Sequence, residues 1–122
     1  MLNRAHRFHG LHALDFVYKQ GQTVRGPAVT LKFAKNNRQQ QFRVAVVVSK
    51  KVSKSAVKRN RMRRRVFAIA HEQLSQLSEP YDLAFMIYDA DVVTMDSEVL
   101  QKQVQGLLRK AAILPAPKLH AA

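Results

Sequence analysis

The chain has 122 residues, 47% of them hydrophobic, and a formal net charge of +13. This length supports one domain with a single core, and the hydrophobic content excludes a wholly disordered chain. The absence of cysteine excludes disulfides and thiolate metal sites, and neither a membrane span nor an apolar signal core is visible, so we expect a cytoplasmic protein.

The N-terminal half predicts a short helix followed by strands. Apolar residues recur at helical spacing within 11–20, and Gly21 can end that helix. Residues 28–34 alternate between apolar and polar side chains, which is typical of a half-buried strand, and one more strand is possible around Thr23. Residues 42–49 are β-branched and nearly continuously apolar, as in an inner strand.

A long helix is predicted from Ala56 to about Leu77, because this segment has no internal Gly or Pro and Ser53 or Ser55 can cap its start. The side chains predicted on its core face are Met62, Val66, Ile69, Ala70, Gln73 and Leu77.

The C-terminal part predicts a strand over Tyr81–Tyr88 and a last helix near Ser97–Ala112. The apolar stripe of that helix consists of Val99, Leu100, Val104, Leu107 and Leu108. The predicted order is α-β-β-α-β-α, an α+β fold in which a small central sheet packs with about three helices as one α/β sandwich. We expect a single RNA-binding domain over 1–114 and a flexible C-terminal tail over 115–122.

The charge is unevenly distributed along the chain. Residues 16–71 contain fifteen Lys or Arg and no acid, so residues 1–71 carry a net charge of +16 and residues 72–122 a net charge of −3. Such asymmetry indicates a polyanion as partner, with nucleic acid favoured over an anionic membrane surface.

Nine of the seventeen residues from Ser49 to Arg65 are Lys or Arg. This segment lies between an apolar strand and a helix patterned for burial, so its charge is predicted on a rigid element. Cations at a helix N-terminus oppose the helix dipole, whereas phosphates there would interact favourably with free N–H groups, the dipole and Arg side chains. A solvated basic face is the alternative, but solvated faces usually mix signs.

A helical wheel divides the Arg residues of this helix into two sets. With Met62 toward the core, Arg61, Arg64 and Arg65 are predicted to point outward, and Arg59 and Arg63 to lie on the flank. The helix would then offer phosphate contacts along more than one line, as a folded RNA requires.

The stretch "VVVSKKVSKSAVKRNRMRRR" resembles the signature of the bacterial ribonuclease P protein subunit. In that family a strand ends in S-K-K and a helix opens with R-N-R followed by paired basic residues. The matching residues here are Ser49, Lys50, Lys51, Arg59, Asn60, Arg61, Arg63 and Arg64. The flanking segments "RFHGLHALDFVYKQGQTVRGPAVTLKF" and "YDLAFMIYDA" are similar to the family's N-terminal helix, first strand and later strand.

The resemblance implies a subunit of a ribonucleoprotein that removes the 5′ leader from precursor tRNA. The family's RNA subunit is the catalyst and holds the Mg²⁺, so the protein is an accessory subunit for which no activity alone is expected. The implied partners are the ribonuclease P RNA and precursor tRNA, without a membrane or an obligate protein partner. The implied fold places the basic helix in a left-handed βαβ crossover.

Two sets of site residues follow from the resemblance and the charge pattern. The residues expected to contact the catalytic RNA are Lys50, Lys51, Lys54, Lys58, Arg59, Asn60, Arg61, Arg63, Arg64 and Arg65. A cleft between the sheet and the N-terminal helix would hold the single-stranded leader through aromatic rings and cations. The residues expected there are Phe8, Phe16, Tyr18, Lys32 and Arg43. The chain departs from the family at Phe67, where an Arg is common.

Other constellations favour ordinary structural roles. His6, His9 and His12 lack a nearby set of carboxylate ligands, so no protein metal site is expected. Asp89, Asp91 and Asp96 suit caps and turns better than metal binding. Two alternatives to the ribonuclease P function stay open: a ribosomal or other structural RNA-binding protein with no role in cleavage, and a cationic membrane-surface protein.

Overall fold

A four-stranded sheet in the order β1-β2-β4-β3 forms the centre of the molecule. The computed structural model describes residues 17, 19, 21–35, 42–75 and 80–113. The strands are β1 (Gln22–Arg25), β2 (Val29–Lys35), β3 (Arg43–Val48) and β4 (Tyr81–Ile87). Strand β2 pairs antiparallel with β1 and β4, whereas β3 and β4 are parallel. The three predicted strands are confirmed to within one residue at each end, and the possible strand around Thr23 is β1.

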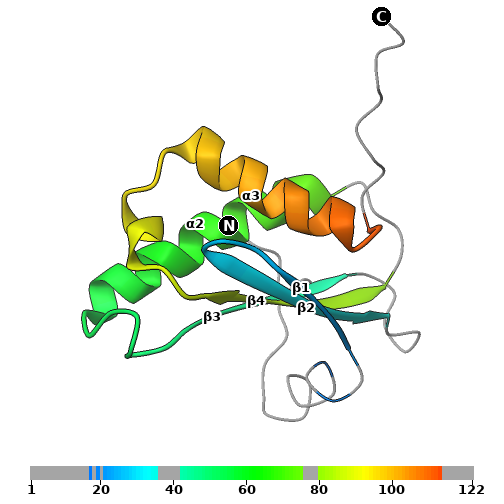
Figure 1. Ribbon diagram of the computed structural model, residues 1–122, viewed down its shortest axis with the longest axis horizontal. Helices are drawn as coiled ribbons and strands as arrows, with labels where there is room; N and C mark the ends of the chain where they lie inside the picture. Colours follow the sequence, from blue (N-terminus) through cyan, green and yellow to red (C-terminus); the bar gives the residue numbers. More distant parts are fainter. Residues whose placement is uncertain (1–16, 18, 20, 36–41, 76–79, 114–122) are drawn as a thin grey trace, which may run out of the picture.

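Two helices cover one face of this sheet (Figure 1). Helix α2 (Ala56–Leu74) connects β3 to the neighbouring parallel strand β4, so the predicted βαβ crossover is confirmed. A 3-10 turn, η2 (Ala90–Val93), leads from β4 to helix α3 (Ser97–Lys110). Neither helix, nor any other within the described ranges, is long and apolar enough to span a membrane.

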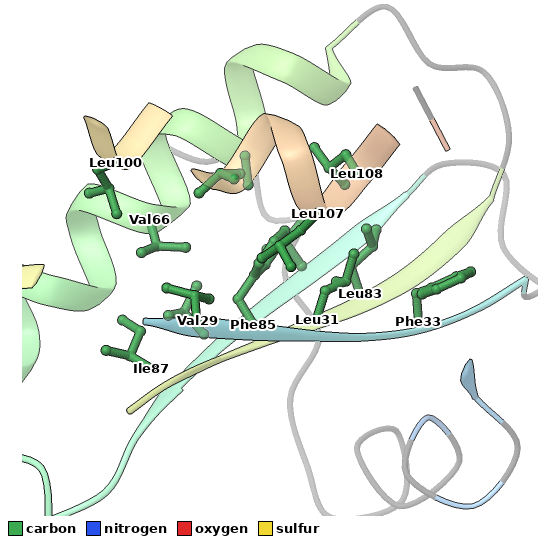
Figure 2. Packing of buried hydrophobic residues seen from close by; sticks show 14 of the residues in the cluster. Val29, Leu31, Phe33, Val66, Leu83, Phe85, Ile87, Leu100, Leu107 and Leu108 are labelled. Atoms are coloured by element: carbon green, nitrogen blue, oxygen red, sulfur yellow. The ribbon is translucent and has the colours of Figure 1, made fainter. Parts of the chain in front are cut away.

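Alternation along the strands separates the two faces of the sheet. On β2 and β4 the side chains of Leu31, Phe33, Leu83, Phe85 and Ile87 join the core beneath the helices (Figure 2). The residues between them point to the opposite face, as the period of two in a strand requires. On that face Ala45 and Ala84 pack with Val17 in a second, smaller buried cluster.

The core face of α2 differs in one respect from the predicted one. Met62, Val66 and Ala70 are buried as expected, but the fourth buried residue is Leu74, and Gln73 is half-buried. The helix packs against both β3 and α3. Its buried residues are spaced four apart, which is slightly more than the 3.6 residues of one turn. The buried stripe therefore winds slowly around the helix and does not stay on a single side. The predicted end near Leu77 lies outside the described residues.

The apolar stripe of α3 is confirmed at four of five positions. Leu100, Val104, Leu107 and Leu108 are buried, and Figure 2 shows Leu107 between α3 and the sheet. The prediction was wrong for Val99, which is 47% exposed. Val99 lies in the first turn of α3, where Ser97 and Glu98 are also exposed and the buried stripe begins only at Leu100.

Of the three acids assigned to caps and turns, Asp89 and Asp96 are caps as predicted, and Asp91 lies in the first turn of η2. Asp89 is the N-cap of η2 and accepts a hydrogen bond from Asp91 N at 2.9 Å. Asp96 is the N-cap of α3 and accepts from Glu98 N at 2.9 Å. These carboxylates satisfy backbone donors that a helix start leaves without an internal partner.

Little of the N-terminal helix predicted over 11–20 lies within the described residues. Val17 and Lys19 are helical, and Gly21 N donates to the Val17 carbonyl at 2.8 Å. A Cβ at Gly21 would lie only 2.3 Å from that oxygen and 2.7 Å from the Phe33 oxygen, so glycine is required where the chain leaves the helix. The predicted tail over 115–122 also lies outside the described residues, and the domain boundary stays a prediction.

An ion pair fixes the start of the two parallel strands. Arg43 Nε and Nη2 donate to the two carboxylate oxygens of Asp82 at 2.8 and 2.7 Å. The Asp82 side chain is fully buried and that of Arg43 is 19% exposed. Bidentate geometry of this kind combines strong hydrogen bonds with a fixed register.

Helix α3 ends at a strained position. Ala112 has φ 60, in the left-handed region. Its N–H bonds the Arg109 carbonyl, and the N–H of Ile113 bonds the Leu108 carbonyl at 3.0 Å, which together form a Schellman motif. Because glycine carries no Cβ penalty there, we expect Ala112→Gly to raise the free energy of unfolding by about 0.5–1 kcal/mol. Urea denaturation measures this, with Ala111→Gly, at the αR C-cap, as a control that should not stabilise.

Candidate nucleic-acid interface

Exposed cations gather on the turn after β3 and on the first turns of α2. We define the cationic surface as the exposed residues Lys50, Lys51, Lys54, Lys58, Asn60, Arg61 and Arg64 together with half-buried Arg63. Ser55 is the N-cap, and its hydroxyl accepts from Lys58 N at 3.2 Å. The first turn of α2 contains no acid. The positive end of the helix dipole and the side-chain charges therefore add at this site.

No carboxylate neutralises the cationic surface within the described parts of the chain. Among those residues the carboxylate of Asp82 pairs with Arg43, which lies at the start of β3, whereas the lysine-bearing turn follows its end. The seven positive charges of the cationic surface thus lie on a rigid element and repel one another, and no carboxylate of the described residues offsets this repulsion. An external anion would relieve this repulsion, and a polyphosphate offers several charges at once.

Arg59 makes an internal contact. Its side chain is half-buried, as the helical wheel predicted, and Nη1 donates to the Ser53 carbonyl at 2.8 Å. This bond joins the first part of α2 to the turn that precedes it. The guanidinium that the sequence assigns to RNA contact is therefore partly used within the protein.

The expected outward direction of Arg65 was wrong. Its guanidinium lies against the segment between η2 and α3 and is surrounded by oxygens. Nη1 donates to the carbonyls of Val92 at 2.6 Å and Val93 at 3.2 Å, and Nη2 donates to the Met95 carbonyl and to Ser97 Oγ. These carbonyls fall just before the N-terminus of α3, where a cation is otherwise unfavourable. Arg65 therefore holds η2 and α3 against α2.

The opposite face of the sheet carries a shallow open concavity of about 460 Å³. Its lining residues are Thr23, Arg25, Thr30, Lys32 and Tyr88. The strand register places Thr23 opposite Lys32 and Arg25 opposite Thr30, on the face that carries Ala84 and not on the helix-covered face. Tyr88 is 60% exposed. An aromatic ring beside two cations can stack on a base and attract its phosphate.

The predicted cleft residues have different outcomes. Lys32 lies in this concavity, whereas the Arg43 guanidinium is engaged by Asp82. Phe8, Phe16 and Tyr18 lie outside the described residues. The assignment of these five residues to a leader site stays a prediction.

Tyr88 was missed as a candidate by reasoning from the sequence. A signal for it was present, because the period of two along β4 puts Asp82, Ala84, Met86 and Tyr88 on one face. Its neighbours across the sheet could not be known before the strand order was known.

The replacement of a family Arg by Phe67 has a structural basis in this chain. Phe67 is half-buried and packs against the main core. An apolar ring at this position adds to the packing of α2.

Among the described residues, no group of three or more His, Cys, Asp or Glu is placed to hold a metal ion.

The chain matches the family model described as Ribonuclease P over residues 2–112. It is 35% identical over 116 residues to the ribonuclease P protein component of Chloroflexus aurantiacus strain J-10-fl, a match that covers 95% of this chain and 84% of that protein. It is 36% identical over 117 residues to the protein of the same name from Synechococcus sp. strain JA-2-3B'a(2-13), covering 93% and 87%.

Solved structures share the fold. The RNase P protein of Staphylococcus aureus superposes with a TM-score of 0.76 at 21% identity, covering 88% of this chain and 96% of that one. The RNase P protein from Thermotoga maritima gives a TM-score of 0.74 at 19% identity, covering 85% and 96%. The α+β arrangement predicted from the sequence agrees with these neighbours.

Proposed function

The chain belongs to the ribonuclease P protein family, and from this premise we propose how it serves the enzyme: its cationic surface docks on the RNA subunit, and the sheet face opposite α2 and α3 holds the leader of precursor tRNA. As the protein component it is an accessory subunit of the endoribonuclease that forms tRNA 5′ ends. Family membership supports this role over the structural RNA-binding protein and the membrane-surface protein that composition alone left open.

The observation that supports docking most strongly is the acid-free charge of α2 and its preceding turn. Arg61 and Arg64 are exposed, and the described residues offer their guanidinium groups no partner. Each can form charge-assisted, bidentate bonds to phosphate oxygens. Phosphates at the start of α2 would also accept from backbone N–H groups that the helix leaves unused.

We propose that the RNA subunit supplies the chemistry and the Mg²⁺. The protein then acts by binding and positioning, which can lower the Mg²⁺ concentration needed to bring substrate and catalytic RNA together. This division of roles is consistent with a cationic surface that contains no carboxylate to activate water or hold a metal ion.

A cleavage assay at low Mg²⁺ tests this function. Precursor tRNA is incubated with a bacterial ribonuclease P RNA, with and without the protein. We expect the protein to accelerate release of the leader, and the protein without RNA to release none. An equal rate with and without the protein, when the two are shown to be bound, would contradict the accessory role.

The leader is single-stranded, and the concavity on the sheet face opposite α2 and α3 has the chemistry that single strands require. Tyr88 offers a ring for stacking, and Arg25 and Lys32 offer charge for the backbone. The concavity lies on the opposite side of the sheet from α2, so the RNA subunit and the leader can be held at the same time. We propose that at least one leader base stacks on Tyr88.

Replacing Tyr88 by Ala tests that contact. Loss of one stacked base costs about 1–3 kcal/mol, so we expect the holoenzyme to bind precursor tRNA about tenfold more weakly and mature tRNA unchanged. The Tyr88→Phe variant keeps the ring and should retain most of the affinity. Equal weakening for precursor and mature tRNA would remove Tyr88 from the leader site.

A further inference from the structure

The turn that joins β3 to α2 carries three exposed lysines, Lys50, Lys51 and Lys54. Two backbone bonds close it, because the N–H groups of Val52 and Ser53 both donate to the Ser49 carbonyl, at 3.1 and 3.4 Å. Like charges this close repel one another, so the closed turn is opposed by its own side chains.

The turn is attached to α2 by two further contacts on Ser53. Its hydroxyl accepts from Ser55 N at 3.3 Å, directly before the helix. Its carbonyl accepts from Arg59 Nη1 at 2.8 Å, which is a contact from a residue already within the helix. The Arg59 N–H also donates to the Ser55 carbonyl at 3.0 Å, so its own backbone is fixed in the first turn of α2.

Arg59 and Arg61 thus differ although they are two residues apart in one motif. Arg59 is half-buried and bonded to the turn, whereas Arg61 is exposed and bonded to none of the described residues. A guanidinium that already donates to a carbonyl has fewer donors left for a phosphate than a guanidinium that is exposed to solvent.

We infer that Arg59 is a positioning residue, which holds the Ser49–Ser55 turn in the shape in which its lysines reach RNA. This inference rests on the proposed docking of the cationic surface. Without Arg59 the lysines keep their charge but lie on a looser turn, and the turn must then be ordered at the moment of binding. That ordering costs conformational entropy and lowers affinity without removing an ionic contact.

Salt dependence separates positioning from direct contact. The affinity of the protein for a bacterial ribonuclease P RNA is measured over a range of salt for Arg59→Ala and for its matched variant Arg61→Ala. We expect Arg59→Ala to lower affinity about tenfold at every salt concentration with the slope of log K against log salt unchanged. Arg61→Ala should reduce the magnitude of that slope by about 0.7–0.9, the share of one phosphate. A slope reduced equally by both variants would overturn the inference.

Amide hydrogen exchange of the free protein gives a second readout that needs no RNA. In Arg59→Ala the amides of Val52 and Ser53 should exchange about tenfold faster, because the turn that protects them opens more often. Amides of β4 and α3 should keep their rates, which also shows that the variant is folded. Unchanged exchange at Val52 and Ser53 would overturn the inference.

A conservative variant keeps the test decisive if Arg59→Ala does not fold. The Arg59→Lys variant retains the charge and can donate one bond to the Ser53 carbonyl. Its Val52 and Ser53 amides should therefore exchange at rates between those of the wild type and those of Arg59→Ala. If neither Arg59→Ala nor Arg61→Ala changed RNA affinity, the proposed docking surface would fail. The exchange rates would still decide whether Arg59 holds the turn.

Discussion

Replacing Arg43 by Ala is expected to lower the free energy of unfolding by about 3 kcal/mol. Asp82 is fully buried and receives two charge-assisted hydrogen bonds from Arg43. The variant removes both donors while the carboxylate stays inside the sheet, so a large part of its desolvation penalty is no longer offset. Urea denaturation at neutral pH measures the loss as a shift in midpoint at constant slope.

Two further variants make that prediction specific. Arg25 is an exposed Arg on the edge strand β1, and Arg25→Ala should change stability by less than about 0.5 kcal/mol. The double variant Arg43→Met/Asp82→Leu removes the charges together, and it should be more stable than Arg43→Ala alone. A destabilisation of Arg43→Ala no greater than that of Arg25→Ala would show that the ion pair contributes little.

Removing Arg61 and Arg64 together should weaken binding of the RNA subunit by at least about a hundredfold at low salt. Each guanidinium is exposed and able to bond a phosphate, and hydrogen bonds that involve a charge contribute about 1.5–3 kcal/mol. Loss of two phosphate contacts should also reduce the salt slope by about 1.4–1.8. Stability should change little, since neither side chain contacts the described core.

The matched control removes the same charge elsewhere. Lys102 and Arg109 are exposed cations on α3, so Lys102→Ala/Arg109→Ala has the same net charge as Arg61→Ala/Arg64→Ala. We expect this control to bind RNA within about threefold of the wild type, as distant charges are screened at physiological salt. Equal losses in both double variants would mean that overall charge, and not the α2 surface, governs binding.

The main elements of the fold could be predicted from local patterns in the sequence. Strand β2 alternates as it should at Val29, Leu31 and Phe33, and the caps at Asp89 and Asp96 follow from the chemistry of a helix start. Such features depend on residues near one another in the chain. They are visible before any tertiary contact is known.

The errors concern residues whose partner comes from a distant segment. Arg65 was expected in solvent, but carbonyls that lie 27 and 28 residues further along the chain accept from it. Leu74 is buried although it was not placed on the predicted core face, because the wheel considered one packing partner, whereas α2 has two. Tyr88 became a candidate only once β2 was known to lie between β1 and β4. Long charged or aromatic side chains can reach several environments, and the tertiary structure selects among them.

The parallel pairing of β3 with β4 also has a kinetic consequence. Arg43 and Asp82 are 39 residues apart in the chain, so a long loop must close before these strands can meet. Closing it costs conformational entropy before any strand pairing stabilises the chain. The most cationic part of the protein lies inside that loop and resists its compaction. Nascent chains should therefore fold faster where dissolved polyanions reduce this repulsion. The cognate RNA is itself a polyanion, so we expect it to accelerate folding of the protein as well as to bind the folded state.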